Sequence, residues 1–426
     1  MTGQESGSRW RQYDGLLKTE TGLTFLNLGN PTGLKFVVDH GDCRALFEMG
    51  IEHAPGAVPF SLGLRPRAGR ELADLMGVGM APRGTGVLEG WDGRTSLFVS
   101  HLHLDHVALV RWVHPDVPLH YPAAMEPLRA ACVRAGYLGW RDPPGVPVPD
   151  RGRVSLGEIE VEFVAVDHDL PGASGFLVRM PDLTLAYTGD HRWHGARPEL
   201  TAGFASAAQH ADVLVQEAVS LGSDPPPEGF PERTEEDVIR GFAGLLDRAR
   251  GLVVVNLYPM NRLRVRALGA ACEARGRMLL MAPAAAAMAD WPLVLESPEA
   301  VRHHPERYCV QVDFESLPVL LDMRPPPGSL FVLSNGSPLG PYDPAYRVML
   351  AWLDALGLEL VSLGSSGHSH LADLRRMVEA VSPRVVLPVH TRRPEALEVP
   401  GFRTLLAQPG RRYTAGELLE AGAASR

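Results

Sequence analysis

Short apolar runs separated by turn residues dominate the first half of the chain, a pattern that is typical of β-strands. Runs over residues 23–29, 34–41 and 43–50 are broken by Asn-Pro, Asp-His-Gly and Met-Gly turns. They predict a meander of hairpins. Helical spacing appears at two places, and further strand-like runs follow at residues 95–100, 117–122, 152–168, 175–180, 183–191 and 211–219.

The pattern changes at about residue 222, where the Pro-rich stretch 223–233 predicts a linker or domain edge. Residues 233–251 then have helical spacing, with Thr234 as the expected N-cap. Strand-like and helical segments alternate from there at residues 252–259, 261–277, 329–336, 346–357, 358–364, 371–382 and 384–390. This alternation is α/β in type, unlike the β-rich first half.

Composition narrows the class of protein. The chain has 426 residues, 45% of them hydrophobic, which suits two or three soluble domains. No apolar run reaches about 18 residues and the N-terminus has no apolar signal region, so we expect a cytoplasmic protein without a membrane span. The four cysteines are scattered, which argues against a thiolate zinc site or a disulfide framework. A net charge of −9 disfavours broad nonspecific binding to nucleic acid, but it leaves room for a local basic groove.

The stretch FVSHLHLDHVAL, residues 98–109, places three histidines and an aspartate within six positions. It follows a strand-like run, and alternation along an extended backbone points His101 and His103 the same way. If a helix begins near Asp105, that carboxylate and His106 face a second point a few ångströms away. The spacing therefore predicts two neighbouring metal ions, and imidazoles with carboxylates suit Zn²⁺ or Mn²⁺.

Further ligands are needed to complete two metal sites. Three candidates each follow a strand-like run, where a rigid scaffold can aim a side chain: His168, Asp190 and His390. Taken alone, each would more simply be a polar residue at the rim of a sheet. Their occurrence in one chain with the histidine cluster favours ligation.

The full order HLHLDH, His168, Thr-Gly-Asp190 and His390 resembles the metallo-β-lactamase superfamily. The resemblance implies an α/β fold, the αββα sandwich of two facing sheets. The early Asp-x-Gly motif of that family is replaced here by Glu48-Met49-Gly50. Because that acid mainly supports the loop, we expect the substitution to be tolerated.

Asp190 and His390 are 200 residues apart, and the long gap resembles the β-CASP insertion of nucleases such as ribonuclease J. Glu217 after a strand-like run and His368 in SSGHSHLADLRRMV match two further motifs of that group. His390 in PRVVLPVHT matches the third. The expected organisation is a first part of the metallo-β-lactamase core at 1–218, a β-CASP insertion at 219–350 and a closing part at 351–426.

The resemblance also implies roles. One metal would take His101, His103 and His168, the other would take Asp105, His106 and His390, and Asp190 would bridge them. The family attacks phosphorus with a metal-bridging hydroxide. His368 would bind the scissile phosphate or protonate the leaving oxygen, and Glu217 would orient a ligand.

Neighbouring residues carry weaker expectations. Ser334, Asn335 and Gly336 would present backbone N–H groups to a phosphate or form a plain turn. The row Arg262, Arg264 and Arg266 would line an RNA groove or form a solvated helix face. Three histidines are expected to be rim or helix-start residues: His191, His194 and His370.

The leading hypothesis is a metal-dependent hydrolase that cleaves single-stranded RNA, with a homo-oligomer as an open alternative to a monomer. The second is a hydrolase of a small molecule, such as a phosphodiesterase or lactonase, on the same metal core. The acidic net charge favours the second, as does the short stretch of about 30 residues after LPVHT. A catalytically silent scaffold is the third, and the complete ligand set argues against it.

Overall fold

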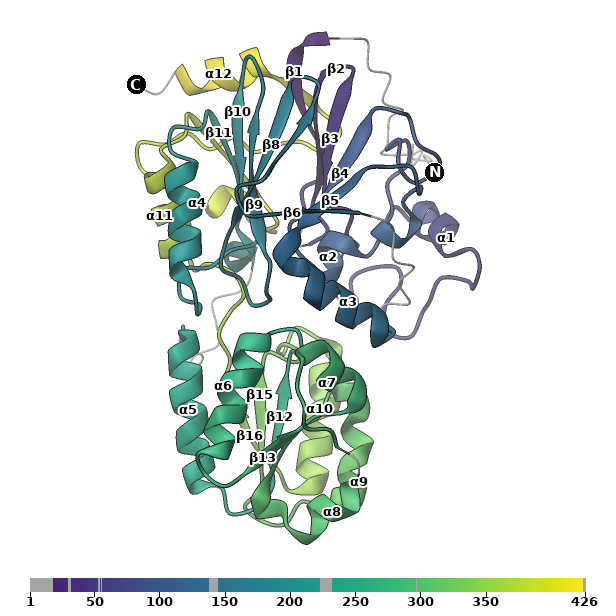
Figure 1. Cartoon of the computed structure of the whole chain (residues 1–426), viewed down its shortest axis with the longest axis vertical. Coiled ribbons are helices and arrows are strands. Elements are labelled where there is room, and N and C mark those ends of the chain that lie inside the picture. Colours follow the sequence, from purple (N-terminus) through teal and green to yellow (C-terminus); the bar gives the residue numbers. More distant parts are fainter. Residues whose placement is uncertain are drawn as a thin grey trace, which may run out of the picture.

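The computed structural model describes residues 18–423 apart from 30–31, 53, 55, 138–144, 223–231 and 296 (Figure 1). Most of the predicted linker at 223–233 lies outside the described residues. Among those that are described, no helix is long and apolar enough to cross a membrane.

The first sheet has seven strands in the described part of the chain, in the order β18-β1-β2-β3-β4-β5-β6. Strands β1 to β3 pair antiparallel, which confirms the predicted meander, and β3 to β6 run parallel. Its strands span Lys18–Asn27 (β1), Lys35–Gly41 (β2), Cys43–Phe47 (β3), Thr95–Phe98 (β4), Leu119–Pro122 (β5), Val146–Val148 (β6) and Arg412–Thr414 (β18).

The second sheet has six strands among the described residues, in the order β17-β11-β10-β9-β8-β7. Strands β10, β11 and β17 are parallel neighbours, so their carboxyl ends meet at one edge of the sheet. That edge carries the segments after Tyr187, Glu217 and Val389. Its strands span Arg153–Leu156 (β7), Ile159–Ala165 (β8), Ser174–Arg179 (β9), Thr184–Tyr187 (β10), Val213–Glu217 (β11) and Val385–Val389 (β17).

The two sheets pack face to face around one aromatic and aliphatic core, in which Phe47 and Phe176 lie with ring centroids 5.2 Å apart. Helices cover both outer faces of the sandwich (Figure 1). This arrangement confirms the predicted αββα sandwich. The first sheet is covered by α1 (Glu71–Gly77), α2 (Leu104–Val107) and α3 (Glu126–Arg134), the second by α4 (Pro198–Ala207) and α11 (Leu371–Val381), and α12 (Ala415–Ala423) ends the described chain.

A third sheet, all parallel, is built between β11 and α11 in the order β13-β14-β12-β15-β16. We call the segment from α5 to β16 the inserted body; it lies below the sandwich in Figure 1. Helices α5 (Glu235–Arg248), α6 (Arg262–Glu273) and α7 (Pro283–Ala289) cover one face. The other face is covered by α8 (Pro298–His303), α9 (Leu320–Met323) and α10 (Pro344–Leu356). The strands span Val253–Leu257 (β12), Met278–Leu280 (β13), Tyr308–Gln311 (β14), Leu330–Ser334 (β15) and Glu359–Ser362 (β16).

The expected boundary at residue 350 needs correction, because it falls inside α10. That helix packs against the third sheet through Met349 and Leu353, and β16 then pairs with β15. The segment that builds the third sheet therefore continues at least to Ser362. Thr234 does cap α5 as predicted, in a capping box with Asp237.

A buried cluster of charges joins the inserted body to the sandwich. Glu235 at the start of α5 accepts from Arg264 of α6 (Oε1 to Nη2, 2.6 Å) and from Arg192 (Oε1 to Nη1, 2.8 Å). Arg192 follows β10 in the sandwich and also donates to the carbonyl oxygen of His168. All three side chains are buried. Arg264 therefore lines neither an RNA groove nor a solvated helix face, the two alternatives expected for its row.

Replacing Glu235 with Gln should lower the free energy of unfolding by about 3–5 kcal/mol, because Arg264 would lose its buried counter-charge and Arg192 would keep only the more distant carboxylate of Asp167 among the described residues. Chemical denaturation measures this change. The matched control is Glu236→Gln at the next position of α5, where the side chain is 81% exposed and pairs with Arg240. That control should change stability by no more than about 0.5 kcal/mol. Equal stability of both variants would refute the role of the buried cluster.

Candidate metal centre

The loop between β4 and α2 carries the histidine cluster, and the Glu48-Met49-Gly50 motif holds it in place. Backbone hydrogen bonds run from Glu48 N to the Phe98 carbonyl oxygen (2.9 Å) and from Met49 N to the His106 carbonyl oxygen (2.8 Å). Gly50 lies so close that a Cβ atom there would be 1.6 Å from the Asp105 carbonyl oxygen. A glycine is therefore required by contact with the backbone that presents the ligands.

Replacing Gly50 with Ala should destabilise the protein by about 3 kcal/mol, because the neighbouring atoms are backbone and have no room to move away. Thermal unfolding and elemental metal analysis measure the effect on fold and site together. Gly77 at the end of α1 is the control, since a Cβ there would meet nothing within 4 Å. We expect Gly77→Ala to leave both properties near those of the parent. A stable, metal-loaded Gly50→Ala protein would contradict the proposed fit.

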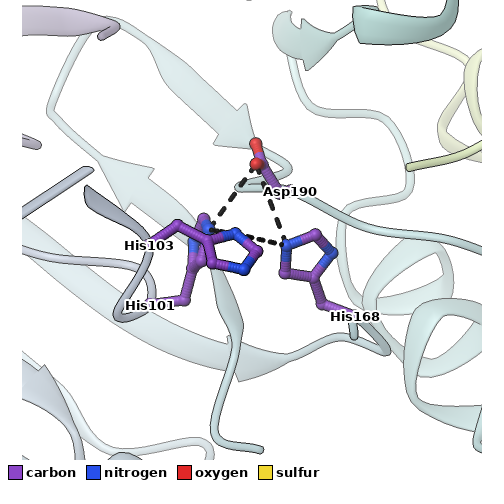
Figure 2. Close-up of side chains that lie close together, drawn as sticks. All are labelled: His101, His103, His168 and Asp190. Carbon is purple, nitrogen blue, oxygen red and sulfur yellow. Dashed lines mark hydrogen bonds and ion pairs between the residues drawn. The ribbon is translucent and has the colours of Figure 1, made fainter. Parts of the chain in front are cut away.

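Three imidazoles meet at one point beside the end of β4. Nδ1 of His103 lies 3.1 Å from Nε2 of His101 and 3.1 Å from Nε2 of His168. Asp190, after β10, directs Oδ2 to within 3.5 Å of Nε2 of His101. Figure 2 shows the three imidazoles gathered around one point, with the Asp190 carboxylate directed toward them. These four side chains offer ligand atoms that all lie within 4.8 Å of one another.

A second group lies directly beside the first. Nε2 of His390 is 3.0 Å from Oδ2 of Asp105, and its Nδ1 is 3.1 Å from Oδ1 of Asp190. Nε2 of His106 lies 3.2 Å from Oδ2 of Asp190. Asp190 therefore contacts both groups, one carboxylate oxygen toward His390 and the other toward His101 and His106. The grouping matches the two ligand sets expected from the sequence.

The donor set fits divalent cations. Oδ2 of Asp190 and both ring nitrogens of His106 are buried and form no hydrogen bond of good geometry with the described residues, although charged atoms lie close to them. Such buried polar atoms need an explanation. Burial lowers the pKa of His168 to about 3, so this ring is neutral, as ligation requires. Ligand atoms about 2.0–2.1 Å from a tetrahedral zinc are separated by roughly 3.3 Å, close to the nitrogen–nitrogen distances found here.

The charges around the second ligand group also favour a bound cation. Burial lowers the pKa of His106, but the carboxylates of Asp190, Glu48 and Asp105 outweigh burial and raise it well above its usual value. Burial likewise opposes protonation of His390, whose pKa Asp190 and Asp105 raise to about 10. The carboxylates thus attract positive charge to this point. A bound cation satisfies the same need.

Outer partners fix the orientation of most ligand rings. Oγ of Ser100 lies 2.8 Å from Nδ1 of His101, and the carbonyl oxygen of Gly367 lies 2.6 Å from Nδ1 of His168. Oε1 of Glu48 lies 3.4 Å from Nδ1 of His106. Such contacts to the outer nitrogen are typical of metal-ligating histidines. The glutamate at position 48 thus supports the site as expected.

His368 lies on the loop that returns from the inserted body to the sandwich, between β16 and α11. Its Nδ1 is 3.7 Å from Oδ2 of Asp190 and 3.5 Å from Oε2 of Glu217. Glu217 in turn accepts from the backbone amides of Val219 and Ser369. With Asp190 and His390, His368 forms a third group that could hold an ion. The structure thus places His368 and Glu217, both predicted from the sequence, beside the two ligand groups.

The turn Ser334-Asn335-Gly336 braces the returning loop. Asn335 has a left-handed backbone (φ +65°), and its Oδ1 accepts from Ser365 N (2.9 Å) and Arg264 Nη1 (2.6 Å). Gly336 N donates to the Asn256 carbonyl oxygen. The amide of Gly336 was predicted to bind a phosphate, and this prediction is wrong because the amide already donates to a carbonyl oxygen. The segment forms a turn, which was the alternative prediction.

The other histidines near the site are also placed. His191 is fully buried, with Nδ1 3.6 Å from Oε1 of Glu217, so the expectation of a rim residue was wrong for it. His194 and His370 stack with ring centroids 4.2 Å apart. Sequence reasoning missed Asp169, which follows His168 and lies against His103. The sequence signal for Asp169 would have been its position directly after the predicted ligand His168.

Comparison with known proteins agrees with this geometry. The family model described as the metallo-beta-lactamase superfamily matches residues 90–231. Ribonuclease J of Mycoplasma genitalium is 23% identical over 198 residues, 45% of this chain and 34% of that protein. Ribonuclease J of Mycolicibacterium smegmatis is 25% identical over 331 residues, 69% of this chain and 58% of that protein. The matches thus span between a third and about three fifths of these relatives.

A solved structure resembles almost the whole chain. A protein of unknown function from Enterococcus faecalis is 25% identical, with a TM-score of 0.78 over 93% of this chain and all of that one. The fold, the gathered ligand residues and the matched family model agree with one another. The chain has the metallo-β-lactamase fold, and its residues 90–231 match the model of that superfamily.

Proposed function

We propose that the protein is a dinuclear metal-dependent hydrolase that cleaves phosphodiester bonds in RNA. The observation that carries the proposal is the convergence of two ligand groups on Asp190 with His368 beside them. Divalent ions, Zn²⁺ or Mn²⁺, would supply an activated water and neutralise charge on phosphoryl oxygens when bound. His101, His103 and His168 would hold one ion, Asp105, His106 and His390 the other, and Asp190 would contact both.

We propose that His368 donates a proton to the leaving oxygen. Its Nδ1 faces the carboxylates of Asp190 and Glu217, which leaves Nε2 to face a substrate. Burial lowers the pKa of His368, but Asp190 and Glu217 outweigh it and raise the pKa above its usual value. Both carboxylates therefore favour the protonated ring, which is the form that a general acid requires. Glu217 acts through His368 and needs no contact with the substrate.

The inserted body supports a nuclease assignment. It emerges between β11 and α11 and returns through the loop that carries His368. We propose that it is the β-CASP domain, here reaching to about Ser362. The relatives named Ribonuclease J support RNA as the substrate class. A cytoplasmic location and a homo-oligomer stay predictions from the sequence.

The second candidate function is hydrolysis of a small phosphodiester or lactone on the same metal core. The positions of the arginines on α6 favour this second function. Arg264 is buried, and Arg266 pairs with Asp290 at 3.0 Å. The net charge of −9 adds to this argument. This row therefore offers too few exposed, unneutralised arginines to form the extended basic surface that RNA binding requires.

One experiment separates the two functions. The protein is loaded with Zn²⁺ or Mn²⁺ and incubated with 5′-labelled single-stranded RNA, and in parallel with bis(p-nitrophenyl) phosphate. Cleavage of the RNA that stops with a chelator supports the proposal, and the label pattern distinguishes endonucleolytic from 5′-exonucleolytic attack. Cleavage of the small diester alone refutes the RNA assignment and supports the second candidate.

A further inference from the structure

His103 differs from the other ligand rings in how it is held. His101 and His168 are fully buried side chains, whereas the side chain of His103 is 18% exposed. It is the N-cap residue of α2, and its ring faces Tyr258 of the inserted body at 5.5 Å between centroids. Packing alone therefore fixes His103 less firmly. A ring at the mouth of a metal site needs a polar partner to hold its orientation.

Asp169 occupies the position of that partner. Its Oδ1 lies 3.2 Å from Nε2 of His103, while Nδ1 of His103 faces His101 and His168. Oδ1 is buried and forms no hydrogen bond within the described part of the chain, so it can still accept from a donor at that ring. The same oxygen lies 3.5 Å from Nε2 of His168. The carboxylate thus sits on the outer side of the His103 ring and close to the first ligand group.

The surroundings fix the place of Asp169. A Cβ at Gly367 would lie 3.0 Å from Cγ of Asp169 and 3.0 Å from Cε1 of His168, so the returning loop packs against both. The carboxylate is therefore held as an acceptor next to the outer ring nitrogen of His103.

We propose that Asp169 is a positioning residue of the metal centre: its carboxylate accepts from Nε2–H of His103 and leaves Nδ1 as the nitrogen that binds the ion. The inference rests on the proposed metal function. It adds a carboxylate–histidine pair to the outer contacts of Ser100, Gly367 and Glu48. It also explains why His103 presents Nδ1 while His101 and His168 present Nε2.

The test is a titration of Zn²⁺ into the chelated protein against a competing chelator dye, for the parent, Asp169→Ala and Asp169→Asn. Asp169→Ala should weaken binding at one of two sites by about 10–100-fold while keeping two ions at saturation. Asp169→Asn retains an acceptor oxygen and should fall between. Nitrogen-15 spectra of histidine-labelled, zinc-loaded protein should show a protonated Nε2 on His103 in the parent and the loss of that uniform tautomer in Asp169→Ala.

Asp116→Ala is the matched control, because Asp116 also lies beside a histidine, His114, but is 70% exposed and outside the site. It should bind zinc as the parent does. Unchanged affinity and tautomer in Asp169→Ala would overturn the inference, as would the loss of one ion at saturation, which would make Asp169 a direct ligand. A parent protein that binds no zinc in the same titration would instead refute the proposed metal function.

Discussion

Replacing Asp190 with Asn is expected to reduce phosphodiester cleavage by about 1000-fold or more and to lower the metal content below two ions per chain. Among the described residues, Asp190 is the carboxylate that contacts both ligand groups, through Oδ1 toward His390 and Oδ2 toward His101 and His106. An amide offers one weak oxygen and a nitrogen that does not bind these ions. Because charge neutralisation at the reacting centre supplies much of such catalysis, both properties should fall together.

Initial rates on labelled RNA and elemental analysis of the same protein samples measure the two effects. Asp247→Asn on α5 is the control, since that side chain is 62% exposed and pairs with Arg275. It should retain full activity and metal. An Asp190→Asn protein that keeps two ions and cleaves at the parental rate would remove Asp190 from the centre.

Replacing His368 with Ala should lower kcat by about 100–10,000-fold while both ions are retained. The expected loss is the usual contribution of a general acid. The metal content should persist because each of the two main ligand groups is complete without His368. Single-turnover rates on RNA and metal analysis give the two readings.

His370→Ala provides the comparison for this variant. His370 lies two positions away on the same loop, but it stacks on His194 and pairs with Glu232 instead of the metal cluster. We expect near-parental activity from it. A His368→Ala protein that loses an ion would show that His368 is itself a ligand, in the group it forms with Asp190 and His390.

The parts of the site that could be predicted depend on local geometry. HLHLDH carries its own spacing, so the division into two ligand groups follows from strand alternation and a helix start at residue 104. His168, Asp190 and His390 each follow a run that reads as a strand. Parallel pairing of β10, β11 and β17 then brings the last two to one edge of the sheet.

The parts that could not be predicted depend on contacts between distant segments. Arg264 has the spacing of an exposed helix residue, and only the approach of Arg192 and Glu235 turns it into a buried ion pair. The sequence suggests that the amide of Gly336 is free to bind a ligand, but in the fold this amide donates to the carbonyl oxygen of Asn256. The boundary at 350 was wrong although the helix at 346–357 was predicted, because the sequence does not show that this helix and the next strand pack on the third sheet.

Counting the ions bound to each chain tests the central claim most directly. Protein is stripped with a chelator, dialysed against Zn²⁺ and in parallel against Mn²⁺, and analysed for metal; anomalous diffraction then locates the ions. Two ions per chain are expected, one at His101, His103 and His168 and the other at Asp105, His106 and His390. A chain that binds no ion at these residues, or binds ions elsewhere, would contradict it.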